Sequence, residues 1–123
     1  LVLEPGGVCP FSAQVVAKDL VGYALHPEGR PSEYRRLIPA TTQGVRVSGG
    51  VQIAGTVVNQ SPHHATRHIV VAGALLDASG QMVSLGSTFI LERVPPSGSA
   101  PFSLYIDYVP YTSYRLYIQA EQE

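Results

Sequence analysis

Hydrophobic and polar residues alternate most clearly between residues 51 and 77, which we take as the centre of the chain. Residues 51–58 carry apolar side chains at every second position, and this period of two predicts a half-buried strand. The segment Ile69 to Leu76 is apolar on both faces, which predicts a central strand covered on both sides. Gly55 falls on the apolar face of the first strand. It predicts a β-bulge or a close approach of another backbone segment.

The downstream part of the chain repeats the period of two. A tight turn at Asp77 to Gly80 follows the central strand, and residues 83–91 are expected to pair back on it as a hairpin. Two further alternating segments, 102–106 and 114–120, predict two more strands. The proline-containing segment 94–99 is expected to cross over before them.

The last two strands can be connected in two ways. In a direct hairpin about Tyr111, Tyr105 would lie opposite Tyr117. Alternatively, the loop Tyr108 to Ser113 crosses from one sheet to the other, and Tyr105 and Tyr117 then lie on different outer faces. We expect the crossover.

The upstream part is less regular. Residues 11–18 alternate and predict a strand, which residues 20–25 either continue or follow as a second short strand. Three prolines interrupt residues 26–43, so this segment is expected to be a long inserted loop. A serine cap and a later proline bracket one or two helical turns at residues 33–37. Residues 44–48 form a candidate short strand before a glycine pair.

Short alternating segments separated by glycine and proline turns are typical of an all-β sandwich or barrel. The 123 residues suffice for one domain with its own core, and 45% of them are hydrophobic. We expect residues 1–10 to be an N-terminal tail and residues 11–123 to form a single β-sandwich domain.

Composition and charge exclude some functions. The formal net charge of -1 argues against binding of nucleic acid through phosphates. No apolar run reaches the roughly 18 residues that span a bilayer. The chain begins at Leu1, so we expect that an upstream segment, conceivably a signal peptide or anchor, has been removed.

The single cysteine, Cys9, allows no intrachain disulfide and no metal cluster built from cysteines. The favoured interpretation is a buried or incidental thiol. The alternative is the lipid-modified cysteine of a bacterial lipoprotein, although Val8 is larger than the residue that normally precedes such a site.

Several segments between residues 51 and 107 resemble a known family, the FxLyD-type domains. These segments are Gly55–Asn59, Val71–Asp77, Ala78–Gly80 and Pro96–Phe102. In the motif that names the family, Leu75 and Asp77 match, whereas Gly73 stands in place of the phenylalanine and Leu76 in place of an aromatic residue. The missing phenylalanine leaves a gap in the core that another side chain must fill.

The resemblance implies an immunoglobulin-like β-sandwich of about seven strands in a bacterial protein, located outside the cytoplasm in the periplasm or on the cell surface. The family shares no catalytic residues. The segment Tyr114 to Ala120 is also similar to strand F of fibronectin type III domains, and Tyr114 would then be the corner tyrosine that bonds back to the backbone.

Histidines offer one candidate chemistry. His63, His64 and His68 are close enough in sequence to bind zinc or copper, with Asp77 or Glu92 as a conceivable fourth ligand. Solvated turn residues are the favoured interpretation, and we expect no metal or other cofactor. Ser61 beside these histidines is the only local pairing of a nucleophile with a base, and it lacks a glycine-flanked turn. We therefore expect no enzymatic activity.

Tyrosine and arginine offer the other chemistry, because these residue types dominate protein-binding hot spots. Tyrosines recur every three residues from Tyr105 to Tyr117, and arginines accompany Tyr34 in the long loop. The alternative is that each ring only packs locally. The binding residues that we predict are Tyr34, Arg35, Arg36, Tyr108 and Tyr111. The predicted function is a non-catalytic extracytoplasmic module for protein–protein interaction or assembly. The alternative is a ligand-binding accessory module for a glycan or a metal.

Overall fold

A computed structural model describes residues 8, 10–13, 21–31, 34–35 and 38–123 of the chain. The part that it describes is all-β and contains no helix, which confirms the all-β part of the predicted fold class. No helix in these residues is long and apolar enough to cross a membrane. The strands are β1 (Tyr34–Arg35), β2 (Ile38–Val47), β3 (Gly50–Val58), β4 (Thr66–Leu76), β5 (Met82–Ile90), β6 (Ser99–Asp107) and β7 (Ser113–Gln122).

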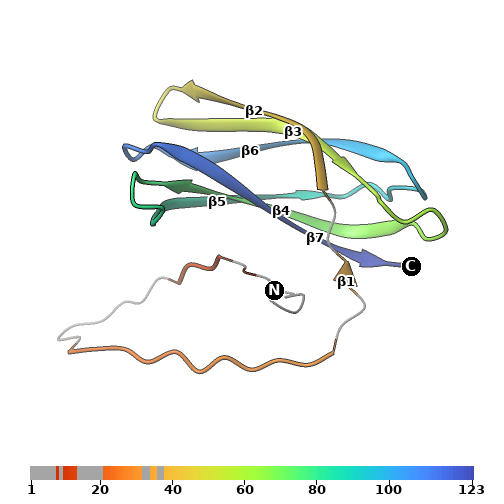
Figure 1. Ribbon diagram of the computed structural model, residues 1–123, viewed down its shortest axis with the longest axis horizontal. Coiled ribbons are helices and arrows are strands. Elements are labelled where there is room, and N and C mark those ends of the chain that lie inside the picture. Colours follow the sequence, from red (N-terminus) through yellow and green to blue (C-terminus); the bar gives the residue numbers. More distant parts are fainter. Residues whose placement is uncertain (1–7, 9, 14–20, 32–33, 36–37) are drawn as a thin grey trace.

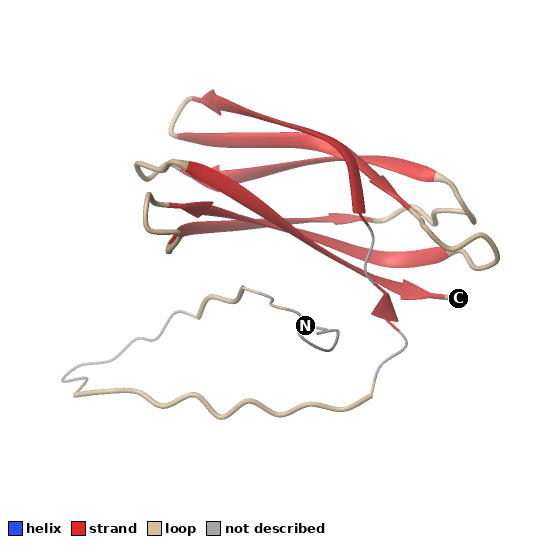
Figure 2. Ribbon diagram, in the orientation of Figure 1, coloured by secondary structure: helices blue, strands red, loops and turns tan. Residues whose placement is uncertain are grey.

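The strands form two antiparallel sheets that pack face to face (Figure 1). One sheet has the order β1-β7-β4-β5 and the other has the order β2-β3-β6. We call them the β4 sheet and the β3 sheet after their central long strands. Residues 21–31, which we call the arm, contain no strand and run apart from both sheets (Figure 2).

The core lies between the sheets and follows the period of two. On β3, Val51, Ile53 and Val57 are buried, and on β6 buried residues alternate with exposed ones along the whole strand. The other core residues are Ile69, Val71, Leu75, Ile90, Val94, Ala100, Phe102, Leu104, Ile106, Ile118 and Ala120. Burial of this apolar surface is the main stabilising term of the fold.

The gap predicted at Gly73 is filled from the opposite sheet. A Cβ atom at Gly73 would lie 3.0 Å from Ile106 Cδ1 and 3.1 Å from Leu104 Cδ1. The two β6 side chains thus occupy the space that a larger residue would need. The requirement for a compensating side chain is confirmed.

The close approach predicted at Gly55 is also confirmed. A Cβ atom there would lie 2.3 Å from the Thr41 carbonyl oxygen and 2.9 Å from Phe102 Cζ. The β2–β3 register shifts between Pro39 and Thr41, so an irregularity in β2 lies next to the glycine. Only a residue without a side chain fits between the β2 backbone and the Phe102 ring.

The hairpin predicted at Asp77 is present between β4 and β5. The Asp77 carboxylate accepts hydrogen bonds from the Ser79 hydroxyl and from the Ser79 and Gln81 amides, and Gly80 has φ +82°. The expected crossover is confirmed as well. β6 belongs to the β3 sheet and β7 to the β4 sheet, so the loop between them passes from one sheet to the other.

The predictions for the upstream part hold only in part: residues 44–47 lie in a strand and residues 26–31 contain none, as expected, but the other expectations fail where the structure tests them. The inserted loop was expected at residues 26–43, but β2 already begins at Ile38 and runs unbroken to Val47. The helical turns expected at 33–37 are wrong at residues 34–35, which form β1. Residues 11–13 and 21–25 contain no strand, and the rest of the predicted 11–18 strand lies outside the described residues. β2 is an edge strand, and proline is tolerated in edge strands because its missing N–H group can lie on the side without a neighbouring strand.

The two open sides between the sheets are closed differently. On the side of β5 and β6 the backbones come close together. A Cβ atom at Gly86 would lie 2.3 Å from the Tyr105 carbonyl oxygen, and the Ser84 hydroxyl donates to the Asp107 carbonyl at 2.8 Å. This side is therefore held by backbone contact.

On the side of β2 and β7 a single ring bridges the sheets. The Tyr114 hydroxyl donates to Thr42 Oγ1 at 3.1 Å, and the ring lies against Gly44, where a Cβ atom would come within 2.9 Å of it. Tyr114 was predicted to bond to the backbone. That detail is wrong, since its recorded partner is a side chain of the facing sheet.

Candidate functional site

The predicted binding residues do not gather into one surface. Tyr108 and Tyr111 lie in the loop before β7, whereas β1 pairs Tyr34 and Arg35 with Glu121 and Ala120 near the other end of that strand. Arg36 lies outside the described residues. The two groups are thus at opposite ends of β7.

Tyr108 and Tyr111 are half-buried and pack against the core. Their rings meet edge to face, with centroids 6.4 Å apart and an interplanar angle of 75°. The Arg46 guanidinium lies 3.5 Å from the centroid of the Tyr108 ring, a cation–π contact between β2 and this loop. These contacts fix the loop against both sheets and leave only part of each ring accessible to a partner.

Two of the three histidines, His64 in the loop before β4 and His68 in β4, bond to residues near the end of β7. His64 Nδ1 lies 2.8 Å from the Glu123 backbone oxygen, and His68 Nδ1 lies 2.5 Å from Glu121 Oε2. Asp77 is engaged in its own turn. Over the part of the chain that the structure describes, no three His, Cys, Asp or Glu residues are arranged to hold a metal ion.

Ser61 does not face an imidazole. Its hydroxyl oxygen accepts from the backbone amides of His63 and His64, at 3.4 and 3.0 Å. The serine therefore caps the loop, and the arrangement of a base beside a nucleophile is missing at this pair.

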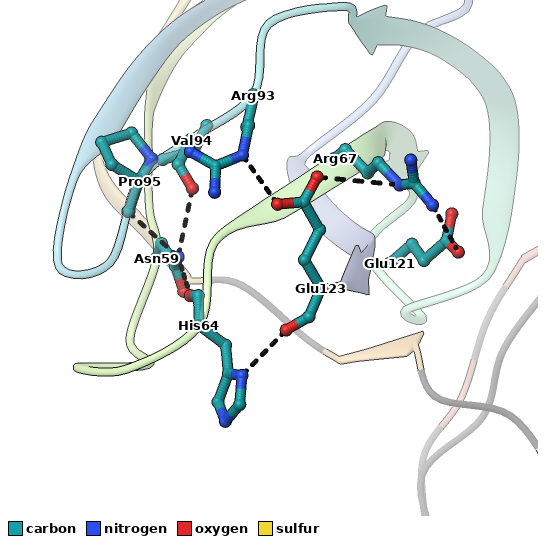
Figure 3. Close-up of polar contacts among 8 residues, drawn as sticks. All are labelled: Asn59, His64, Arg67, Arg93, Val94, Pro95, Glu121 and Glu123. Atoms are coloured by element: carbon teal, nitrogen blue, oxygen red, sulfur yellow. Dashed lines mark hydrogen bonds and ion pairs between the residues drawn. The ribbon is translucent and has the colours of Figure 1, made fainter.

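A buried asparagine organises this end of the molecule (Figure 3). Asn59 is 1% exposed, and its Nδ2 donates to the carbonyls of His64, Val94 and Pro95. Its Oδ1 accepts from the Ser61 amide at 3.0 Å. One side chain thus ties the histidine loop to the segment that crosses between β5 and β6.

Ion pairs surround the C-terminus at the same end (Figure 3). Arg93 Nε lies 2.7 Å from Glu123 Oε2, and Arg67 lies between Glu121 and Glu123 at 3.5 and 3.9 Å. All of these groups are partly exposed, so each pair contributes little to stability. The two arginines balance the two glutamates, which leaves no strong field for a charged ligand.

The pH dependence of this cluster can be predicted. The hydrogen bond from His68 holds the pKa of Glu121 below its ordinary value of 4.5, partial desolvation opposes this shift, and the charge of Arg67 adds to it. A carboxyl whose pKa is lowered by folding stabilises the protein above its unfolded pKa and loses that contribution as the pH falls through the folded pKa.

We therefore expect the stability advantage of the wild type over Glu121→Gln to be present at neutral pH and to vanish in the acid range. Urea unfolding midpoints measured from pH 7 to pH 3 check this. Glu92→Gln, at an exposed position, serves as control and should show no such convergence. Parallel curves for wild type and Glu121→Gln would contradict the assignment.

The outer face of the β4 sheet carries an apolar surface. On β4 the side chains that point away from the core are Val70, Ala72, Ala74 and Leu76, flanked in register by Phe89 and Leu85 of β5 and by Tyr117 of β7. Phe89 is 66% exposed, and Leu91 just beyond β5 is 93% exposed. The sequence predicted that β4 would be covered on both sides. Within the described residues, a second sheet covers only its inner face, so this prediction is wrong there.

Phe89 is exposed, and the partly buried aliphatic side chains Val70, Leu76 and Leu85 lie on the same face. An exposed aromatic side chain beside other apolar ones is typical of a contact surface for another protein. We call the set Val70, Leu76, Leu85 and Phe89 the β4 outer face. The outer face of the β3 sheet is mixed: Gln52 and Ser103 hydrogen-bond to each other at 2.8 Å, and Val45 and Tyr105, which flank Gln52 in register, are each 48% exposed. Comparison with protein-family models, curated proteins and solved structures gave no match to this chain.

Proposed function

We propose that this chain is a non-catalytic, immunoglobulin-like β-sandwich module that acts outside the bacterial cytoplasm by binding another protein. The observation that carries the proposal is the apolar β4 outer face, with Phe89 at its edge. Phe89 is 66% exposed beside partly buried apolar side chains of β4 and β5, and aromatic side chains in such a setting are enriched at protein interfaces.

The strand order supports the immunoglobulin-like assignment. The order β2-β3-β6 corresponds to strands A, B and E, and β5-β4-β7 corresponds to strands C′, C and F. The crossover from β6 to β7 corresponds to the E–F connection. The extracytoplasmic location rests on the resemblance to FxLyD-type domains.

The contacts of the candidate groups support a role without catalysis. Ser61, the histidines and Asp77 all bond to the backbone or to neighbouring side chains. The β4 outer face can bind a partner by burying apolar side chains that water now contacts. Aromatic side chains such as Phe89 make the largest contributions in such contacts.

Site-specific photo-crosslinking tests the proposal. With p-benzoylphenylalanine in place of Phe89, irradiation of cells that produce the protein should give a discrete protein adduct whose crosslink maps to one site on one partner or on a second copy. The same probe in place of Ser103, on the outer face of the other sheet, is the matched control and should give none. Absence of an adduct at position 89, or equal adducts at both positions, would overturn the proposal.

A further inference from the structure

The outer edge of β7 is paired with a described strand only near the end of β7. β4 pairs with the inner edge of β7 over most of its length, whereas on the outer edge β1 contributes only Tyr34 opposite Glu121 and Arg35 opposite Ala120. No described strand pairs with the outer edge from Ser113 to Tyr117. An edge of this kind presents backbone donors and acceptors to any extended segment that reaches it.

The arm supplies an extended segment with the side-chain pattern of a strand. Val21, Tyr23 and Leu25 alternate with Gly22, Ala24 and His26, and the three large apolar residues are at least 61% exposed. The arm makes no strand pairing of its own, and Figure 1 shows it running apart from the sheets. Three apolar side chains on one face of an extended segment are costly to leave in water.

We propose that the arm of one copy adds to the outer edge of β7 in a second copy, as an antiparallel strand with Tyr23 opposite Leu116. In this register Val21 lies opposite Ile118 and Leu25 opposite Tyr114, so the apolar face of the arm points inward. The arm strand then ends just before Ala120, where β1 already occupies the edge in the same orientation.

The receiving side chains favour this register. Leu116 and Tyr114 pack against the core and are only half-buried, and no described strand pairs with β7 on the outer side of these two residues. An added strand would cover both. On the other face, Gly22 and Ala24 would lie beside Tyr117 and Arg115, where small residues leave room for long side chains.

The geometry favours a second copy over the arm of the same chain. β1 fixes residue 34 beside Glu121, at the C-terminal end of β7. For its own arm to lie antiparallel on residues 113–118, the chain would have to reverse direction twice between Leu25 and Tyr34. An arm from another molecule needs no such reversal. The strand addition is independent of the β4 outer face and goes beyond the function proposed above.

Light scattering coupled to size exclusion, over a concentration series of the full chain, tests the inference. We expect a dimer or larger species whose β7 amides between Ser113 and Tyr117 exchange slowly with deuterated water. Successive N–H groups of a strand point to opposite sides. At least one of the variants Tyr23→Pro and Ala24→Pro therefore removes a backbone N–H group that donates to β7. That variant should have the mass of a single chain and rapid exchange at these amides.

Glu28→Pro, in the arm but outside the pairing segment, is the matched control and should assemble like the wild type. A wild-type monomer at every concentration would overturn the inference, whether its β7 amides are protected or not. Assembly that persists in both Tyr23→Pro and Ala24→Pro would also overturn it. Neither result bears on the photo-crosslink at position 89, so the two proposals fail separately.

Discussion

Replacement of Asn59 with alanine is expected to lower the free energy of unfolding by about 3 kcal/mol. The side chain is 1% exposed and joins the histidine loop to the segment between β5 and β6. In the variant the carbonyls of Val94 and Pro95 still accept backbone amides, but the His64 carbonyl and the Ser61 amide lose this partner. Buried polar groups without partners are the main source of the cost.

Chemical denaturation measures this effect, as a lower midpoint at an unchanged slope. Gln60→Ala, one residue further at an exposed position, is the matched control and should leave the midpoint in place. Asn59→Asp should cost at least as much as alanine, because a carboxylate would face carbonyl oxygens to which the amide now donates. An Asn59→Ala midpoint equal to that of Gln60→Ala would contradict the role of Asn59.

Gly86→Ala is expected to destabilise the fold by about 2–3 kcal/mol, since the new methyl group would meet backbone atoms that cannot rotate away. The Cβ atom of the new alanine would lie 2.3 Å from the Tyr105 carbonyl oxygen and 2.9 Å from Ile106 Cγ1. β5 and β6 would have to separate, which also weakens the bond from the Ser84 hydroxyl to the Asp107 carbonyl. Thermal and urea unfolding both report the loss.

Gly29→Ala makes the same chemical change at a position with no other atom within 4 Å of the added methyl group. Its unfolding midpoint should match that of the wild type. If Gly86→Ala were as stable as Gly29→Ala, the close contact between β5 and β6 would not be a determinant of stability.

The sequence predicted those strands whose side chains alternate strictly. The segments assigned to β3, β5, β6 and β7 are strands, the hairpin at Asp77 is present, and the crossover before β7 is as expected. Gly55 could be assigned a close backbone approach because a glycine on an apolar face has few other uses. These features depend on local pattern, which a single sequence displays.

Features that depend on the position of a strand in its sheet were not predictable in this way. The three prolines of residues 26–43 predicted a loop, yet one of them, Pro39, lies in the edge strand β2, where a proline is tolerated. The apolar sequence of β4 predicted cover on both faces, whereas among the described residues a second sheet packs on one face only and Phe89 stays exposed on the other. Local pattern gives the apolar character of a side chain and does not say what packs against it.

In the candidate site, too, the local pattern gave the residue types but not their contacts. Tyr108 and Tyr111 were chosen for exposure, but Arg46 and the core hold them half-buried. Asn59 reads as an ordinary turn residue in the sequence, because two of its three carbonyl partners, Val94 and Pro95, come from a segment far along the chain. Only the approach of distant segments distinguishes a buried asparagine of this kind from a solvated one.

The interleaved pairing of the strands has a consequence for the order of folding. β3 pairs with β6 and β4 pairs with β7, so each sheet needs a strand from the last third of the chain. During synthesis the β4–β5 hairpin leaves the ribosome before either of these partners and must keep its apolar β4 edge unpaired until β7 follows. Non-local pairing of this kind slows folding, so we expect a chaperone or a late, cooperative collapse to protect the nascent chain.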